Sequence, residues 1–324
     1  MSCDDIEIRN TIFGMKPLKA PGTDGLHAIF YQSQWDIVGP SFYRFIKDIF
    51  SCGKIPKEIN KTLLVLVLKI DNPTNFKMFH PISLCTMAYK TVTKIIANRL
   101  QMLLSQLIGP HQTSFVLGRH IVENIVTAQE VIHYMRRKTG KRGFMAIKIN
   151  LEKVYDQLSW NFIYETLKET GILLDLIHLV MGCITSARMN ILWNEEVTEE
   201  FLPSRKIRQG DPISPYIFVL CIERLSHGIC RAVHSGEWRL IKMSRNGTPL
   251  THLFFADDLL LLIEAVPDQA RVINEVLESF CNSFEAFVNR TKTKVIFFSK
   301  NISERKRSRI GRMLGFTITQ DLGK

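Results

Sequence analysis

Two adjacent carboxylates, Asp257 and Asp258, lie between two runs of almost purely hydrophobic residues within the segment His252 to Ile263. This pattern predicts two strands joined by a tight turn over residues 251–264, with the carboxylates at the tip. Paired like charges between apolar runs need a neutralising cation, and Mg²⁺ prefers hard oxygen ligands. In phosphoryl transfer such carboxylates hold two cations about 4 Å apart. Because Asp is common in turns, the motif alone favours a plain solvated hairpin tip.

A second segment of chemical interest runs from Arg208 to Phe218. Gly210 lets the backbone approach a ligand closely. Asp211 or Ser214 can cap the helix that is expected to follow. The segment therefore offers a glycine and a helix N-terminus to an anion, and the alternative is simply a capped helix after a turn.

The elements that must position these segments follow from hydrophobic periodicity. Helices are expected at 5–15, from about 26 to 51, and at 86–107, 121–136, 159–185, 215–234 and 268–287. A buried strand is expected at 62–70, further strands at 144–151 and 294–299, and hairpins at 187–203 and 251–264. The second half thus has the order of an antiparallel sheet with helices on one face, an α+β layer.

Composition describes an ordinary globular protein with a basic surplus. Its 324 residues, 46% hydrophobic and 23% charged, allow one large domain or two smaller ones. The net charge of +11 indicates either polyanion binding or merely a basic, soluble protein. The seven Cys form no CxxC pair, which favours reduced core residues in an intracellular protein without a zinc site. We expect neither a signal peptide nor a membrane span.

Several segments, in chain order, resemble the sequence motifs of reverse transcriptases, most of all those of plant LINE (non-LTR) retrotransposons. The resemblance covers nearly the whole chain, and its order makes it far more specific than any one motif. The segments that carry it are Lys19 to Gly25, Phe79 to Leu84, Gln112 to Arg119, Arg208 to Phe218, Phe254 to Asp258 and Val288 to Lys300.

The resemblance implies the fingers and palm of a right-hand polymerase, with an antiparallel palm sheet backed by helices and the thumb largely absent. On this interpretation residues 1–60 precede the fingers, 61–143 are fingers-like and 144–300 are the palm, with 204–218 contacting the fingers. Residues 301–324 would begin a truncated connection toward the thumb. No endonuclease is expected before this region, and no full thumb or RNase H domain after it.

The activity that the resemblance implies is RNA-directed DNA polymerisation with two Mg²⁺ ions, or Mn²⁺. The substrates would be an RNA template, a DNA primer and deoxynucleoside triphosphates, with no membrane involved and protein partners unknown. Asp257 would be the principal metal ligand and Asp258 would support it. Location in the nucleus and cytoplasm is expected from the resemblance alone.

Further site residues are also implied by the resemblance. Lys292 would protonate the pyrophosphate leaving group, although a solvated basic turn explains it as well. Tyr155 would screen the sugar 2′ position. The nucleotide and template would contact the remaining candidates, which are Arg208, Gln209, Gly210, Lys69 and His80.

The chain departs from the family pattern at Asn150, where related sequences carry the Asp that bridges both cations. Asn offers one neutral carbonyl oxygen and is a poor Mg²⁺ ligand. Because each ~1.4 kcal/mol is tenfold in rate, we expect polymerase activity to fall by roughly two to four orders of magnitude. Glu152 is not expected to compensate, because it lies about 6–7 Å further along the strand.

Two other departures accompany Asn150: His80 replaces a usual Arg, and Glu285-Ala286 replaces a Ser-Gly turn. The chain therefore reads as a fragmentary or decayed copy. Three functions are open: a reverse transcriptase domain, a non-catalytic nucleic-acid-binding remnant of one, and an unrelated phosphohydrolase or structural protein. Asn150 favours the remnant for this copy, and the ordered motifs disfavour the third.

Overall fold

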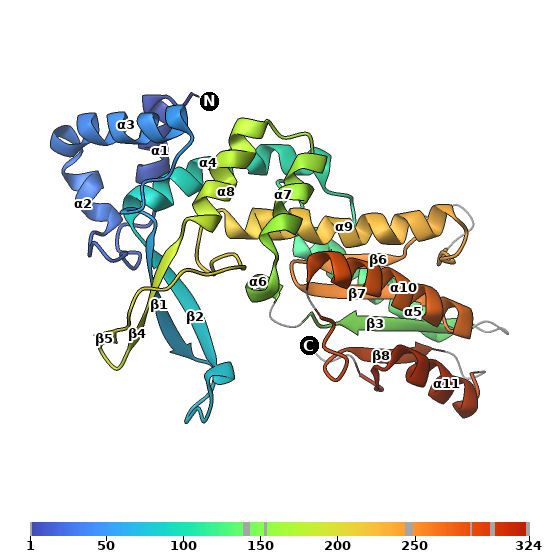
Figure 1. Cartoon of the computed structure of the whole chain (residues 1–324). Helices are drawn as coiled ribbons and strands as arrows, with labels where there is room; N and C mark the ends of the chain where they lie inside the picture. Colours follow the sequence, from blue (N-terminus) through green and yellow to red (C-terminus); the bar gives the residue numbers. More distant parts are fainter. Residues whose placement is uncertain are drawn as a thin grey trace. The chain divides into compact units, whose positions relative to one another are not determined.

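The computed structural model describes residues 2–138, 143–151, 154–243, 249–285, 287–298 and 302–321. The chain forms two compact units (Figure 1). Unit 1 comprises Met1–Met102 and Leu158–Ile217, and unit 2 comprises Leu103–Gln157 and Phe218–Lys324. The predicted ranges 61–143 and 144–300 cut across both units, because the chain leaves unit 1 at residue 102 and returns to it at 158.

Unit 1 combines helices with a four-stranded sheet. The strand order is β2-β1-β4-β5, with β1 antiparallel to β2 and parallel to β4. Its elements are α1 (Asp5–Phe13), α2 (Ala28–Ser33), α3 (Trp35–Cys52), β1 (Lys61–Leu68), the short 3₁₀ helix η1 (Phe76–Met78), β2 (Phe79–Cys85), most of α4 (Met87–Leu107), α7 (Trp160–Glu169), α8 (Leu174–Thr185), β4 (Arg188–Trp193) and β5 (Glu196–Val197).

The β1–β2 hairpin differs from the sequence prediction in two ways. The end of β1 is exposed and not buried as predicted: Val67 and Leu68 are 43% and 55% exposed. β2 was not predicted, since Pro81 interrupts its pattern. Pro81 is tolerated there because β2 is an edge strand, where one unmade ladder hydrogen bond faces outward.

Unit 2 is built on a five-stranded sheet of order β6-β7-β3-β8-β9 (Figure 1). The central strand β3 is antiparallel to both β7 and β8. The elements of unit 2 are α5 (Ile121–Arg137), β3 (Phe144–Ile149), α6 (Val154–Gln157), most of α9 (Ser214–His234), β6 (His252–Phe255), β7 (Asp258–Glu264), α10 (Pro267–Phe284), β8 (Lys294–Phe298), α11 (Glu304–Leu314) and β9 (Thr317–Ile318).

Both faces of the unit 2 sheet are covered. Ala146 of β3 packs on one face against Val131 and Met135 of α5. The alternate residues Met145 and Ile147 are completely buried as well. A strand buried on both faces reads as a continuous hydrophobic run, and it gives the polar residues at its end a rigid support.

The α+β fold and the antiparallel sheet are as predicted, and most elements lie within a few residues of their predicted bounds. The acidic turn lies one residue earlier than expected, at Ala256 and Asp257. Helix α11 was not predicted, although Ser303 caps its start and the left-handed Gly315 ends it. None of the helices in the described part of the chain is long and apolar enough for a membrane span.

Candidate active site

The acidic hairpin is a two-residue turn between paired strands. Phe255 pairs with Asp258, so Ala256 and Asp257 form the tip, and both carboxylates are exposed. Ala256 has a φ of 51°, the left-handed conformation in which glycine is usual at this turn position. Because a non-glycine residue there costs about 1–2 kcal/mol, neighbouring contacts must hold the turn.

Asn150 lies at the same end of the sheet as the acidic turn. Ile149, the last residue of β3, pairs with Leu259 of β7, so Asn150 and Asp258 are the next residues on adjacent strands. The backbone of Asn150 is fixed, because its N–H donates to Thr293 Oγ1 at 3.1 Å and its carbonyl accepts from Asn289 N at 2.8 Å. The exposed Asn150 therefore lies next to the acidic turn, at the end of β3.

The loop that carries Lys292 is tied to Asn150. Asn289, which donates to Asn150, also accepts from Lys292 N at 3.0 Å through its side chain. The Lys292 side chain is exposed. The sequence did not predict the role of Thr293, the buried residue whose Oγ1 accepts from the backbone N–H of Asn150. The one feature that marks Thr293 in the sequence is its position between two lysines.

Tyr155 stands close to the acidic turn. Its ring stacks on Phe218, with 4.7 Å between centroids and 19° between planes. Burial, together with the negative charge of Asp257, raises the pKa of Tyr155 to about 12. The Tyr155 phenol is therefore neutral and lies close enough to Asp257 to feel its charge.

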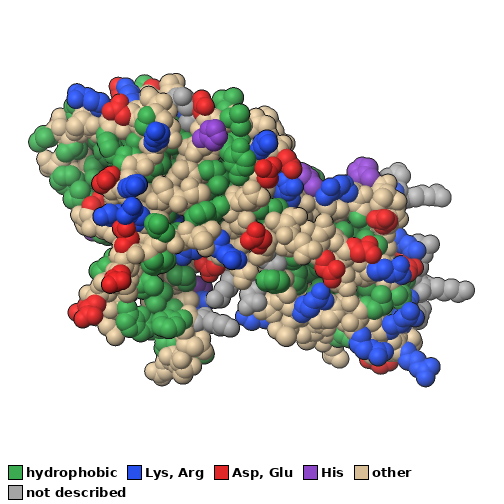
Figure 2. All heavy atoms as spheres, viewed as in Figure 1, with side chains coloured by type: hydrophobic (Ala, Val, Ile, Leu, Met, Phe, Trp, Pro, Cys, Tyr) green, Lys and Arg blue, Asp and Glu red, His purple; other side chains and the backbone are tan. Residues whose placement is uncertain are grey.

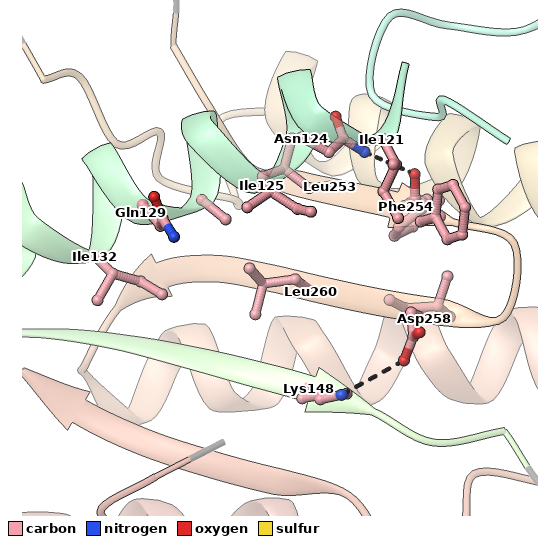
Figure 3. Close-up of a pocket in the computed structure, with 13 residues that line it drawn as sticks. Ile121, Asn124, Ile125, Gln129, Ile132, Lys148, Leu253, Phe254, Asp258 and Leu260 are labelled. Carbon is pink, nitrogen blue, oxygen red and sulfur yellow. Dashed lines mark hydrogen bonds and ion pairs between the residues drawn. The ribbon is translucent and has the colours of Figure 1, made fainter. Parts of the chain in front are cut away.

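A groove of about 350 Å³ runs between α5 and the acidic hairpin (Figure 3). Its sides are apolar, formed by residues such as Ile121 and Ile125 of α5 and Leu253 and Leu260 of the hairpin. At one end Asp258 points toward Lys148 of β3 (Figure 3), with 3.5 Å between Asp258 Oδ1 and Lys148 Nζ.

The ligands for a divalent cation are only partly present. Asp257 and Asp258 are exposed hard-oxygen ligands of the kind that Mg²⁺ prefers. Asn150 adds a neutral oxygen where a third charge was expected. No group of three His, Cys, Asp or Glu side chains that could hold a metal occurs in the described residues. Glu152 lies outside the described residues. The set fits a cation but is one charge short.

Arg208 lies in unit 1, and its side chain is 3% exposed. Nη1 donates to Asn60 Oδ1 and Thr62 Oγ1, both at 2.8 Å, and Nη2 donates to Cys183 O at 2.8 Å. The guanidinium also lies over the Tyr89 ring. Contact between Arg208 and the template stays a prediction, because both terminal nitrogens are already engaged inside the unit.

The backbone beside Arg208 requires a glycine. Gly210 has a φ of 99°, and a Cβ atom there would lie 3.2 Å from Ser83 O. Ser83 N donates to Gln209 O at 2.9 Å, so the turn is attached to β2. Lys69 and His80 are exposed residues of the β1–β2 hairpin. Glu285, another departure from the family pattern, has a φ of 59° at the end of α10.

Comparisons with known proteins identify the family of the chain. Residues 69–318 match the family model "Reverse transcriptase (RNA-dependent DNA polymerase)". The Transposon TX1 uncharacterized 149 kDa protein of Xenopus laevis is 28% identical over 85% of this chain and 20% of its own length. The "Retrovirus-related Pol polyprotein from type-2 retrotransposable element R2DM" of Drosophila melanogaster is 25% identical over 76% of this chain and 22% of its own length.

The fold has a solved counterpart in an apo telomerase from Candida tropicalis truncated from the C-terminal domain. The TM-score is 0.54 at 12% identity, covering 87% of this chain and 59% of that one. This likeness shows that the α+β fold is the fingers-and-palm fold of right-hand polymerases. The chain belongs to the reverse transcriptase family, as a domain of the non-LTR retrotransposon type, and spans about a fifth of the length of these curated relatives.

Proposed function

We propose that this chain is the polymerase core of a LINE-type element and that it carries out template-directed nucleotidyl transfer on an RNA template with a DNA primer. The observation that carries the proposal is the position of Asp257 and Asp258 beside residue 150, at one end of a rigid sheet. On this proposal unit 2 contains the palm and the unit 1 sheet belongs to the fingers. The nucleus and cytoplasm remain the expected compartments.

Each residue at this end of the sheet has a proposed role. Asp257 and Asp258 would hold divalent cations, Mg²⁺ or Mn²⁺, with Asn150 as a neutral third ligand. Bound cations would stabilise the charge that develops on the attacking and leaving oxygens. Lys292 would supply a proton to the leaving pyrophosphate, and Tyr155 would form the wall beside the sugar.

Nucleic-acid binding is supported by an exposed basic surface on α11. Arg305, Arg309 and Arg312 are all exposed, and their spacing puts them on one side of the helix. Figure 2 shows Lys and Arg side chains over the part of unit 2 that contains α11. We propose that these three arginines, here called the α11 arginines, bind phosphates of the template–primer.

Asn150 limits turnover in this proposal. Replacing a ligating carboxylate by an amide removes one charge from the cation site, which costs several kcal/mol in the transition state. The second candidate function is therefore a nucleic-acid-binding remnant that keeps the fold but does not turn over. Asn150 is the specific observation that favours it.

Primer extension on an RNA template with Mg²⁺ or Mn²⁺ tests the proposal. Asn150→Asp is expected to raise the rate by about two to four orders of magnitude. Asn282→Asp, on the exposed face of α10, is the matched control for an added carboxylate and should change nothing. Asp257→Asn in the Asn150→Asp protein should abolish extension.

Each alternative predicts a different result in the same assay. Equal, robust extension by the parent and Asn150→Asp would refute the role of position 150. If neither protein extends but both bind template–primer in a salt-sensitive way, the remnant function is the correct one.

A further inference from the structure

The outer edge of β6 is paired at Phe254, close to the acidic turn. Phe254 N donates to His111 O at 2.8 Å, and Phe254 O accepts from Thr113 N at 3.3 Å. The next outward amide is that of Ala256, and it donates to Gln112 Oε1 at 3.3 Å. The backbone of residues 111 and 113 thus pairs with Phe254, and the Gln112 side chain takes over this role at Ala256, at the tip of the turn.

The orientation of the Gln112 amide is fixed by two backbone donors. Its Oε1 accepts from Ala256 N and, at 2.9 Å, from Ser114 N, so the oxygen must face the turn. Gln112 is 1% exposed, and its Nε2 has no hydrogen-bond partner in the described residues. A buried unpaired donor costs about 1–3 kcal/mol, so folding stability alone does not account for Gln112.

Arg119 holds the loop that presents Gln112. Its guanidinium donates to three backbone carbonyls: Nη2 to Ile108 O at 2.8 Å, and Nη1 to Gln112 O at 2.7 Å and to Gly109 O. Lys cannot replace this contact, because an ammonium lacks the planar fork that reaches several acceptors at once. The motif from Gln112 to Arg119 therefore has a local physical purpose inside unit 2.

We propose that Gln112 and Arg119 form a positioning device that holds Ala256 in its left-handed conformation and thereby aims the Asp257 carboxylate at the cation. Arg119 orders the loop, and Gln112 carries that order to the tip. The part of the inference that concerns cation binding by Asp257 rests on the proposed function. The hydrogen bond to Ala256 and its effect on the turn do not depend on turnover.

Amide hydrogen exchange at Ala256, measured by NMR on the full chain, tests the device directly. Gln112→Met keeps the side-chain volume and removes the acceptor, and we expect exchange at Ala256 about three- to tenfold faster. Asn124→Leu is the matched control, because Asn124 Nδ2 donates to Phe254 O at 2.9 Å on the same hairpin but away from the tip. It should leave Ala256 exchange unchanged.

Mn²⁺ affinity, followed by the EPR signal of the free ion, tests the purpose. Gln112→Met and Arg119→Lys should each weaken Mn²⁺ binding about three- to tenfold. The double variant should lose no more affinity than the single variant with the larger loss, because both substitutions act through the same contact. Arg119→Lys keeps the positive charge. If it loses Mn²⁺ affinity as Gln112→Met does, the loss comes from positioning and not from a lost contact between Arg119 and phosphate. Asn124→Leu should bind Mn²⁺ as the parent does.

Three results would overturn parts of this inference, each in a distinguishable way. Parental exchange at Ala256 in Gln112→Met would refute the hydrogen bond. Faster exchange with unchanged Mn²⁺ affinity would refute the positioning role. If Asp257→Asn leaves Mn²⁺ binding of the parent unchanged, the proposed function fails, while the exchange result still decides whether Gln112 holds the turn.

Discussion

Lys148 and Asp258 form an ion pair across adjacent strands, with 3.5 Å between Nζ and Oδ1. Lys148 pairs with Leu260, so its side chain lies on the same sheet face as Asp258, toward the groove of Figure 3. The two side chains are 32% and 67% exposed, so solvent screening leaves the pair little effect on stability. Its consequence is local, because an ammonium beside Asp258 opposes a second positive ion there.

Removing this ammonium should therefore tighten cation binding. We expect Lys148→Met to bind Mn²⁺ about two- to fivefold more tightly than the parent, by titration with EPR detection. Lys294→Met is the matched control. Lys294 lies on β8 and pairs with Lys148, so it is one strand further from Asp258. An equal gain in both variants would mean a general charge effect, and weaker binding in Lys148→Met would mean that Lys148 orients Asp258 for the ion.

The buried Arg208 network should dominate the stability of unit 1. Asp211 Oδ2 lies 3.4 Å from Arg208 Nη2 and accepts from Tyr89 Oη at 2.6 Å. Arg208→Met strands the Asp211 charge in the core, and we expect unfolding free energy to fall by about 3–5 kcal/mol in urea titrations followed by Trp fluorescence.

Two further variants check that interpretation. Arg208→Met combined with Asp211→Asn should recover part of the loss, because no buried carboxylate is then left unpaired. Arg188→Met breaks an exposed pair with Glu200 in the same unit and should cost less than about 1 kcal/mol. Additive losses in the double variant would show that Arg208 and Asp211 stabilise the unit independently.

Local patterns predicted the elements, whereas contacts between distant segments lay beyond them. The acidic hairpin and the central strand follow from apolar runs around Asp257 and before Asn150. The burial of Arg208 did not follow, because its partners Asn60 and Cys183 are far away in sequence. Gln112 belongs to a recognisable sequence motif, but its contact with Ala256 spans 144 residues and has no local signal.

A buried histidine should make unit 2 sensitive to acid. Burial, with a further contribution from His111, lowers the pKa of His252 from 6.5 to about 3. Its ring nitrogens instead contact Thr251 Oγ1 at 2.7 Å and Ser226 Oγ at 3.0 Å. Between pH 6.5 and 3 the unfolded chain binds a proton at His252 that the folded chain excludes. The contribution of His252 to the free energy of unfolding is therefore fully present above pH 6.5 and is lost as the pH falls toward 3.

We expect the unfolding free energy of unit 2 to drop by about 1.4 kcal/mol per pH unit through this group. Trp238, the one tryptophan within the ranges of unit 2, reports the transition in urea titrations. His252→Gln should remove this slope. Because His111 has a pKa lowered by burial and Glu223 a pKa raised by it, the difference between parent and variant is the quantity to compare. Identical slopes would mean that His252 is protonated in the folded chain.

The α11 arginines should account for part of the salt dependence of nucleic-acid binding. Each phosphate contact releases counterions and contributes about 0.9 to the slope of log K against log salt on duplex DNA, and about 0.7 on single strands. Replacing Arg305, Arg309 and Arg312 together by Gln should therefore lower the slope by about two to three in fluorescence-anisotropy titrations of labelled template–primer.

The matched control removes the same net charge from cations that already have a carboxylate partner. Lys47, Arg188 and Arg271 lie 2.7, 2.6 and 2.9 Å from Asp5, Glu200 and Asp268, respectively. Their triple Gln variant should leave the slope close to that of the parent, because paired cations attract few phosphates. Equal slope changes in the two triple variants would mean that net charge alone drives binding, and that α11 has no specific contact with the phosphate backbone.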